Sequence, residues 1–139
     1  MFGHVAFGSY LYARGELARA AELMAERTST LRQLGFRHSM HDALFIQAKA
    51  TRGLGQTEQA FQLLHQARTV AEGLQSRRLP WQIYAMFSEM EMERGNNGQA
   101  GNYRAQAVGI IEYIVAHTPP EFRQAFLNLP DVHAVIAPA

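Results

Sequence analysis

Few residues of this chain have the types and the spacing that chemistry requires. There is no cysteine, which excludes a thiolate nucleophile, a disulfide framework and a cysteine-ligated metal. The single lysine, Lys49, follows Ala48, so the chain lacks a phosphate-binding loop of the Gly-Lys-Ser/Thr kind. No nucleophile, general base and orienting group occur at a recognisable spacing. We therefore expect a protein that is not an enzyme and that uses no cofactor.

Histidine supplies one candidate for a metal site. His38 and His41 lie three residues apart with Asp42 beside them, and residues three apart share one face of a helix. Imidazole and carboxylate groups on one face can bind a metal such as zinc. Two histidines and one carboxylate without further spacing constraints also arise by accident, and we predict no metal site.

Composition excludes several classes of partner. The 139 residues suffice for one domain, and a hydrophobic content of 47% can form its core. A net charge of +1 gives no field that would hold the chain on nucleic acid or on an anionic membrane, and the pair Arg77-Arg78 is too short to change this. The apolar run from Val108 to Ala116 is interrupted by Glu112 and is too short to span a bilayer. We expect a cytoplasmic protein without nucleic-acid or membrane partners.

The sequence contains a repeat, and this repeat predicts how the helices of the chain are arranged. Three glycines lie forty residues apart, and an alanine follows each of them after five residues. The positions are Gly15, Gly55 and Gly95, with Ala20, Ala60 and Ala100. A fixed period in this range indicates a protein built from stacked repeats.

Apolar residues at helical spacing predict six helices in three antiparallel pairs. The expected ranges are about 2–14, 16–34, 39–54, 57–75, 80–94 and 99–117. Ser39, followed by Asp42 after three residues, predicts an N-terminal cap for the third helix.

The tail departs from the period. Thr118 and Glu121 predict a capping box that places Pro119 at the first position of a short seventh helix. This helix should run to about Leu127, and Pro130 should end it before a last turn over 131–136. Large apolar side chains of the tail are expected to cover the open end of the last pair, as terminal caps do in repeat arrays. They are Phe122, Phe126, Leu127, Leu129, Val132 and Ile136.

Within each unit, a small residue of the first helix precedes a small residue of the second by twelve positions. The pairs are Gly8 with Ala20, Ala48 with Ala60, and Ser88 with Ala100. This spacing resembles the tetratricopeptide repeat, in which two small residues let the helix backbones cross closely. The resemblance implies one domain, a right-handed α-solenoid of three antiparallel helix pairs plus a short C-terminal capping helix. Its repeats would span about 1–37, 38–78 and 79–117, with the cap at 118–139.

The units also depart from that family. The family period is about 34 residues, so the helices are longer here. Gln47, Arg27 and Arg104 stand where the family pattern has large apolar or small residues, and the proline that usually ends a unit is absent. Long units of this kind, and the tail over 121–132, resemble the repeat arrays at the C-terminal end of large bacterial signalling ATPases and transcription regulators. That resemblance implies a sensor or scaffold part of a bacterial regulatory protein.

The resemblance further implies a binding groove lined by the first helix of each pair. The partner-binding candidates at its positions are Tyr12, Phe45, Lys49, Arg52, Glu89 and Met92. Alternatively, Lys49 and Arg52 pair with Glu89 and Glu93 in a solvated network, in which each ion pair contributes about 0 to 1 kcal/mol. The family's clamp for peptide carboxylates is not expected, because Lys49 and Arg52 are the only suitable groups at these positions.

The aromatic and methionine residues of the fifth helix have two interpretations. They form a flexible methionine-rich binding surface, or they form core, which we favour. The cluster consists of Trp81, Tyr84, Phe87, Met90 and Met92.

The first unit begins at Met1 with no polar capping helix before it, and such a helix normally closes a repeat array. Apolar surface would then be open at this end. The self-association candidates are Phe2, Val5, Phe7, Tyr10 and Leu11. We predict a homodimer with two-fold symmetry in which first units pack on each other. The alternative is an upstream domain that covers this edge in a longer protein.

These features together predict a non-enzymatic protein–protein interaction module that binds a protein or peptide partner, or a second copy of itself. The alternative is a small-molecule sensor with a ligand pocket on the concave face, between Tyr12, Phe45, Arg52 and the aromatic residues of the fifth helix.

Overall fold

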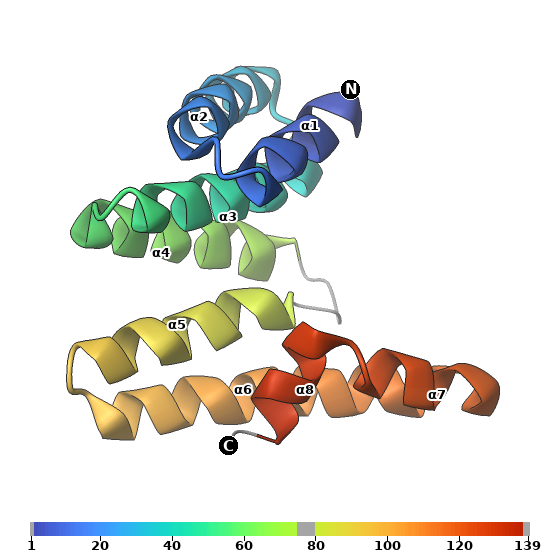
Figure 1. The fold of residues 1–139 in the computed structure, drawn as a ribbon. Helices are drawn as coiled ribbons and strands as arrows, with labels where there is room; N and C mark the ends of the chain where they lie inside the picture. Colours follow the sequence, from blue (N-terminus) through green and yellow to red (C-terminus); the bar gives the residue numbers. More distant parts are fainter. Residues whose placement is uncertain (1, 75–79, 138–139) are drawn as a thin grey trace. The chain divides into compact units, whose positions relative to one another are not determined.

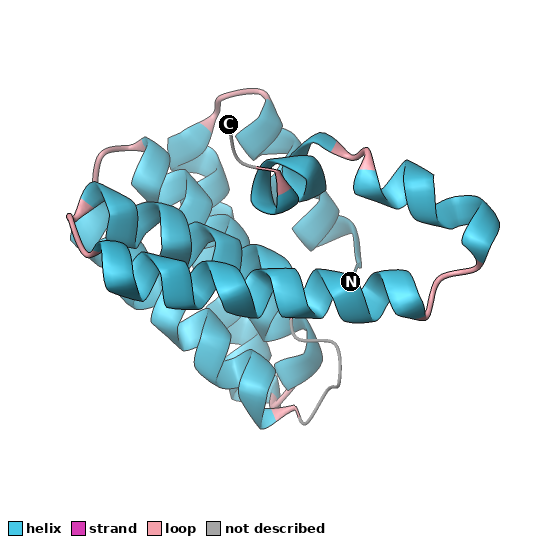
Figure 2. Cartoon of the chain, turned by 90° about the horizontal axis from the view of Figure 1, so that it is seen from below, coloured by secondary structure: helices cyan, strands magenta, loops and turns pink. Residues whose placement is uncertain are grey.

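The structure, a computed structural model, describes residues 2–74 and 80–137, without the side chains of residues 2–5 and 38. This part of the chain is all-helical and contains eight helices and no strand (Figure 2). The helices are α1 Phe2–Ala13, α2 Leu17–Leu34, α3 Arg37–Gly53, α4 Thr57–Gly73, α5 Trp81–Glu93, α6 Asn97–Ala116, α7 Pro120–Leu127 and α8 Pro130–Ile136. The all-α prediction is confirmed.

The chain divides into two compact units, Met1–Ser76 and Arg77–Ala139. In the first unit, α1 packs on α2 and α3, and α3 packs on α2 and α4 (Figure 1). In the second unit, α5 packs on α6, and α7 and α8 pack on α6 and on each other. Each unit has its own apolar core.

The three repeated glycines form the same turn. Gly15, Gly55 and Gly95 have φ values of 82°, 85° and 81°, a left-handed conformation that L side chains rarely adopt. The amide of the next residue donates to the carbonyl oxygen five residues back, as between Glu16 and Leu11 at 2.9 Å. The corresponding bonds of the other two turns measure 3.1 and 2.9 Å. This is the Schellman closure of a helix, so the forty-residue period of the sequence is also a period of the backbone.

One of the small pairs predicted to face each other does so closely. The Ser88 hydroxyl on α5 donates to the Ala100 carbonyl oxygen on α6 at 2.9 Å. A Cβ atom placed on Gly8 would lie 2.6 Å from the Met24 methyl carbon, which is closer than real Cβ atoms approach. Ala20, the predicted partner of Gly8, is fully buried. The Ser88–Ala100 bond shows that α5 and α6 approach closely at this pair, and a side chain at position 8 would displace the end of Met24.

The cores are formed by apolar side chains of the packed helices. In the first unit, Met24, Leu31 and Ile46 belong to one buried cluster. In the second unit, the rings of Phe87 and Tyr103 stack with centroids 4.7 Å apart. The core interpretation of the fifth-helix cluster is confirmed for Trp81, Tyr84, Phe87 and Met90, which are buried. It is wrong for Met92, which is 59% exposed.

The capping predictions were wrong at both sites. Helix α3 begins at Arg37 after Phe36 with no side-chain cap, so Ser39 lies inside the helix. The Thr118 hydroxyl donates to the Ile114 carbonyl oxygen at 2.6 Å, and this bond closes α6 instead of opening α7. Helix α7 has Pro119 as its N-cap and begins one residue later than predicted.

The tail covers α6 incompletely. Val132 is 1% exposed, whereas Phe122, Leu129 and Ile136 are 60%, 51% and 39% exposed. Pro130 begins α8 where a last turn was expected. Arg104, which departs from the repeat pattern, holds α8 on α6 by donating from Nε to the Val135 carbonyl oxygen at 3.0 Å.

Of the helices in the described ranges, none combines the length and the apolar character that a bilayer crossing requires.

Candidate functional site

Three of the predicted groove residues come together in the first unit. Phe45 and Lys49 lie four residues apart on α3 and therefore share one helix face, and Tyr12 lies near the end of α1, which packs on α3. The Lys49 Nζ atom is 4.5 Å from the centroid of the Tyr12 ring and 5.2 Å from that of the Phe45 ring. All three side chains are partly exposed. We call this the aromatic–lysine surface.

The geometry of this surface is that of a cation–π contact with two rings. An ammonium within about 6 Å of a ring centroid is attracted by the negative ring face, by about 0.5 to 1 kcal/mol at an exposed site. The rings also orient the flexible lysine stem, so less conformational freedom remains to be lost when a partner binds. The surface therefore presents a positive charge between two apolar ring faces.

Arg52 adds a second positive charge to the same helix. It lies three residues after Lys49 on α3 and is partly exposed. Residues three apart on a helix are neighbours on its surface, so α3 has two adjacent cationic groups. A negatively charged segment with an apolar side chain has the complementary chemistry.

Glu89 and Met92 belong to the second unit. Both are exposed on α5, three residues apart, and Met92 is 59% exposed. Their participation in one groove with Lys49 stays a prediction, as do the alternative ion pairs of Lys49 and Arg52 with Glu89 and Glu93.

The predicted self-association edge is formed in part. Phe7 and Tyr10 on α1 are 45% and 48% exposed, and their rings stack with centroids 6.2 Å apart. Leu11 is 2% exposed and packs with Ala20 and Ala50 in a buried cluster. Its predicted place on open apolar surface is therefore corrected. The side chains of residues 2 and 5, the candidates Phe2 and Val5, lie outside the described part.

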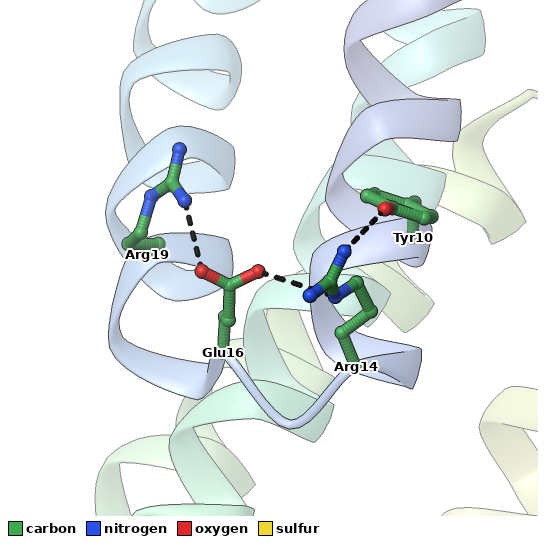
Figure 3. A network of polar contacts seen from close by, with 4 residues as sticks. All are labelled: Tyr10, Arg14, Glu16 and Arg19. Atoms are coloured by element: carbon green, nitrogen blue, oxygen red, sulfur yellow. Dashed lines mark hydrogen bonds and ion pairs between the residues drawn. The ribbon is translucent and has the colours of Figure 1, made fainter.

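A polar network borders the exposed Tyr10 ring (Figure 3). Arg14 donates from Nη1 to the Tyr10 hydroxyl at 2.7 Å, and its Nε atom lies 3.8 Å from Glu16 Oε2. Arg19 donates to Glu16 Oε1 at 2.9 Å. This network fixes the orientation of an exposed ring and gives the aromatic pair a charged rim.

The histidine candidate is limited to one contact. His41 Nε2 lies 3.3 Å from Asp42 Oδ1, and the side chain of His38 lies outside the described part. Among the residues that the structure describes, no three histidine, cysteine or acidic side chains are grouped as metal ligands would be.

A cavity that the sequence reasoning missed lies in the second unit, between α6, α7 and α8. Its volume is about 330 Å³, and its lining is apolar except for Glu112 and Arg123. The apolar lining consists of Val108, Ile111, Val115, Ala116, Leu127 and Ile136. Among the α6 lining residues, Ile111 and Val115 lie at the apolar helical spacing from which a buried helix face is predicted. The fifth-helix aromatics named for a pocket of the sensor alternative are instead buried in the core of this unit.

Comparison with known proteins adds no relative to this description. No protein-family model, no curated protein and no solved structure matches the chain.

Proposed function

We propose that this chain is a non-enzymatic protein–protein interaction module, a right-handed α-solenoid similar to tetratricopeptide repeats. Three turns of the same geometry at a forty-residue period and the close contact of Ser88 with Ala100 between paired helices support this. In this proposal the module is the cytoplasmic sensor or scaffold part of a bacterial regulatory protein. It binds a partner segment or a second copy of itself.

The observation that carries the proposal is the position of the Lys49 ammonium over the rings of Tyr12 and Phe45. A partner segment with a carboxylate beside an apolar side chain would pair its charge with Lys49 and pack its apolar group on a ring. Charge-assisted hydrogen bonds are about twice as strong as neutral ones, and aromatic side chains often supply the packed anchors of interfaces. The proposed partner is therefore an acidic peptide with interspersed apolar residues.

The test is a peptide selection followed by affinity measurement. Peptides selected from a random display library against the chain should be enriched in aspartate or glutamate next to apolar residues. The double variant Lys49→Glu with Arg52→Glu should weaken their binding by more than tenfold in calorimetry, because it places like charges opposite the peptide.

The matched control is Arg32→Glu with Arg37→Glu. It makes the same change in net charge at two exposed positions of the same unit, and it should leave the affinity within about threefold. Circular dichroism melts of both double variants report whether the fold is intact. Equal affinity of the two double variants for the selected peptides would contradict the proposal.

A further inference from the structure

The second unit contains a cavity that is separate from the aromatic–lysine surface of the first unit. The cavity between α6, α7 and α8 has a volume of about 330 Å³, at the lower end of the range for small-molecule sites, which is roughly 300 to 1,000 Å³. From the α6 side it is lined by Val108, Ile111 and Val115, whose spacing puts them on one helix face. An apolar cavity of this size has room for a ligand of about ten non-hydrogen atoms, given the roughly 30 Å³ that each water molecule occupies in the liquid.

The walls of this cavity are held by two arginines that bind backbone carbonyl groups. Arg104 donates to the carbonyl oxygens of Val135 and Ile136 at 3.0 and 3.3 Å, which fixes the end of α8. Arg123 donates from Nε to the Thr118 carbonyl oxygen at 2.8 Å, which fixes the first turn of α7 to the connection that follows α6. Arg104 therefore ties α8 to α6, Arg123 holds the start of α7, and both short helices pack on α6 (Figure 1).

Arg123 gives the cavity its chemical preference. Its side chain lines the cavity and is partly buried, and its Nε bond leaves the two terminal nitrogens for other partners. Among the residues that the structure describes, no carboxylate forms an ion pair with Arg123. The planar fork of a guanidinium matches a carboxylate, and partial burial strengthens this pairing relative to open water. Glu112 also lines the cavity, but it is exposed, so water screens its charge.

We propose that this cavity binds a small apolar monocarboxylate, with the aliphatic chain against α6 and the carboxylate on Arg123. The matching probe is octanoate, which has about ten non-hydrogen atoms. Ligand efficiencies typical of small ligands give an expected Kd on the order of 1 mM for such a molecule.

The experiment compares three probes of equal chain length on the full chain by NMR titration. Octanoate should bind, with shifts confined to residues 108–136. Octanol, which lacks the charge, should bind about tenfold more weakly, because it cannot form the bidentate ion pair that a carboxylate forms with Arg123. Octylammonium should bind more weakly still. The proposal would be overturned if octanol bound as tightly as octanoate, or if octylammonium bound more tightly. It would also be overturned if octanoate did not bind at ten times the expected Kd, or if the shifts were centred on the first unit.

Variants test the contribution of the Arg123 charge separately from that of the cavity shape. Arg123→Gln should weaken octanoate about tenfold and leave octanol unchanged, whereas Arg37→Gln, the same change in the first unit, should do nothing. Glu112→Gln removes a like charge from the lining and should tighten octanoate by up to about twofold. Ala116→Phe fills the cavity from an exposed position and should weaken both probes. If Arg123→Gln loosens α7, the other two variants still test the proposal, because octanoate affinity should rise in Glu112→Gln and fall in Ala116→Phe. Unchanged octanoate affinity in both of these variants would overturn the proposal.

Discussion

At the scale of single residues, Glu91 is a buried carboxylate with exposed partners. It is 5% exposed, accepts a hydrogen bond from the Asn96 amide at 3.0 Å, and lies 3.9 Å from Arg94 Nε. The equivalent position forty residues earlier is Thr51 and eighty residues earlier is Leu11, both buried. A leucine is therefore compatible with this place in the repeat.

We predict that Glu91→Leu stabilises the protein. Removing the carboxylate abolishes the cost of burying a charge, and water can solvate Asn96 and Arg94 because both are exposed. The free energy of unfolding should rise by about 1 kcal/mol, measured by urea denaturation. Glu93→Leu makes the same chemical change at an exposed position and should shift stability by less than about 0.5 kcal/mol. A loss of stability in Glu91→Leu would show that its polar contacts outweigh desolvation.

At the scale of elements, the glycine turns connect the paired helices. A residue other than glycine in the left-handed conformation costs roughly 1 to 2 kcal/mol. Gly95 has φ 81°, and no atom lies within 4 Å of an added Cβ, so backbone strain is the sole penalty expected there. Gly101 lies exposed inside α6 with ordinary helical backbone and similar open space.

The same substitution should therefore have opposite signs six residues apart. Gly95→Ala should lower the free energy of unfolding by about 1 to 2 kcal/mol. Gly101→Ala should raise it by about 0.5 to 1 kcal/mol, because glycine is a poor helix former. Thermal melts followed at 222 nm distinguish these outcomes as shifts of a few degrees in opposite directions. Two shifts of the same sign would contradict the turn geometry.

Elements also show how far sequence reasoning extends. Helix ranges and glycine turns were predictable because apolar periodicity and a missing Cβ act over a few residues. The capping box at Thr118 failed because the hydroxyl donates back to the Ile114 carbonyl oxygen of α6 and does not accept from an amide of α7. The bonds of Arg104 to carbonyl groups 31 and 32 residues away depend on tertiary packing and have no local signal.

The candidate site was also predictable from the sequence only in part. The resemblance to tetratricopeptide repeats named Tyr12, Phe45 and Lys49, and helix spacing alone placed Phe45 beside Lys49. The approach of the Tyr12 ring to the Lys49 ammonium depends on how α1 packs on α3. The cavity was missed because lining residues and core residues of α6 have the same spacing, and only the positions of α7 and α8 distinguish them.

At the scale of the whole molecule, the exposed pair Phe7 and Tyr10 predicts self-association. Two stacked rings that are nearly half exposed offer a second copy apolar area bordered by charged groups, and a two-fold dimer would bury both pairs at once. Sedimentation velocity over a concentration series should show a monomer–dimer equilibrium.

The variant Phe7→Glu should weaken this dimer by more than tenfold, because it would bury a charge in an apolar contact. Phe36→Glu is the matched control, since Phe36 is 47% exposed in the same unit. It should leave the equilibrium unchanged. A wild-type chain that stays monomeric at high micromolar concentration, or equal effects of the two variants, would contradict the self-association proposal.

The likeness of the three glycine turns has a consequence for protein engineering. Their φ values span 81° to 85°, and their closing hydrogen bonds span 2.9 to 3.1 Å. The three turns therefore have the same backbone conformation and can replace one another. Segments 11–20, 51–60 and 91–100 can accordingly serve as cassettes, each exchanged for another without a change of chain length. Recombination at these turns offers a route to longer or reordered helical arrays, in which the surface residues of the helices vary while the turns stay constant.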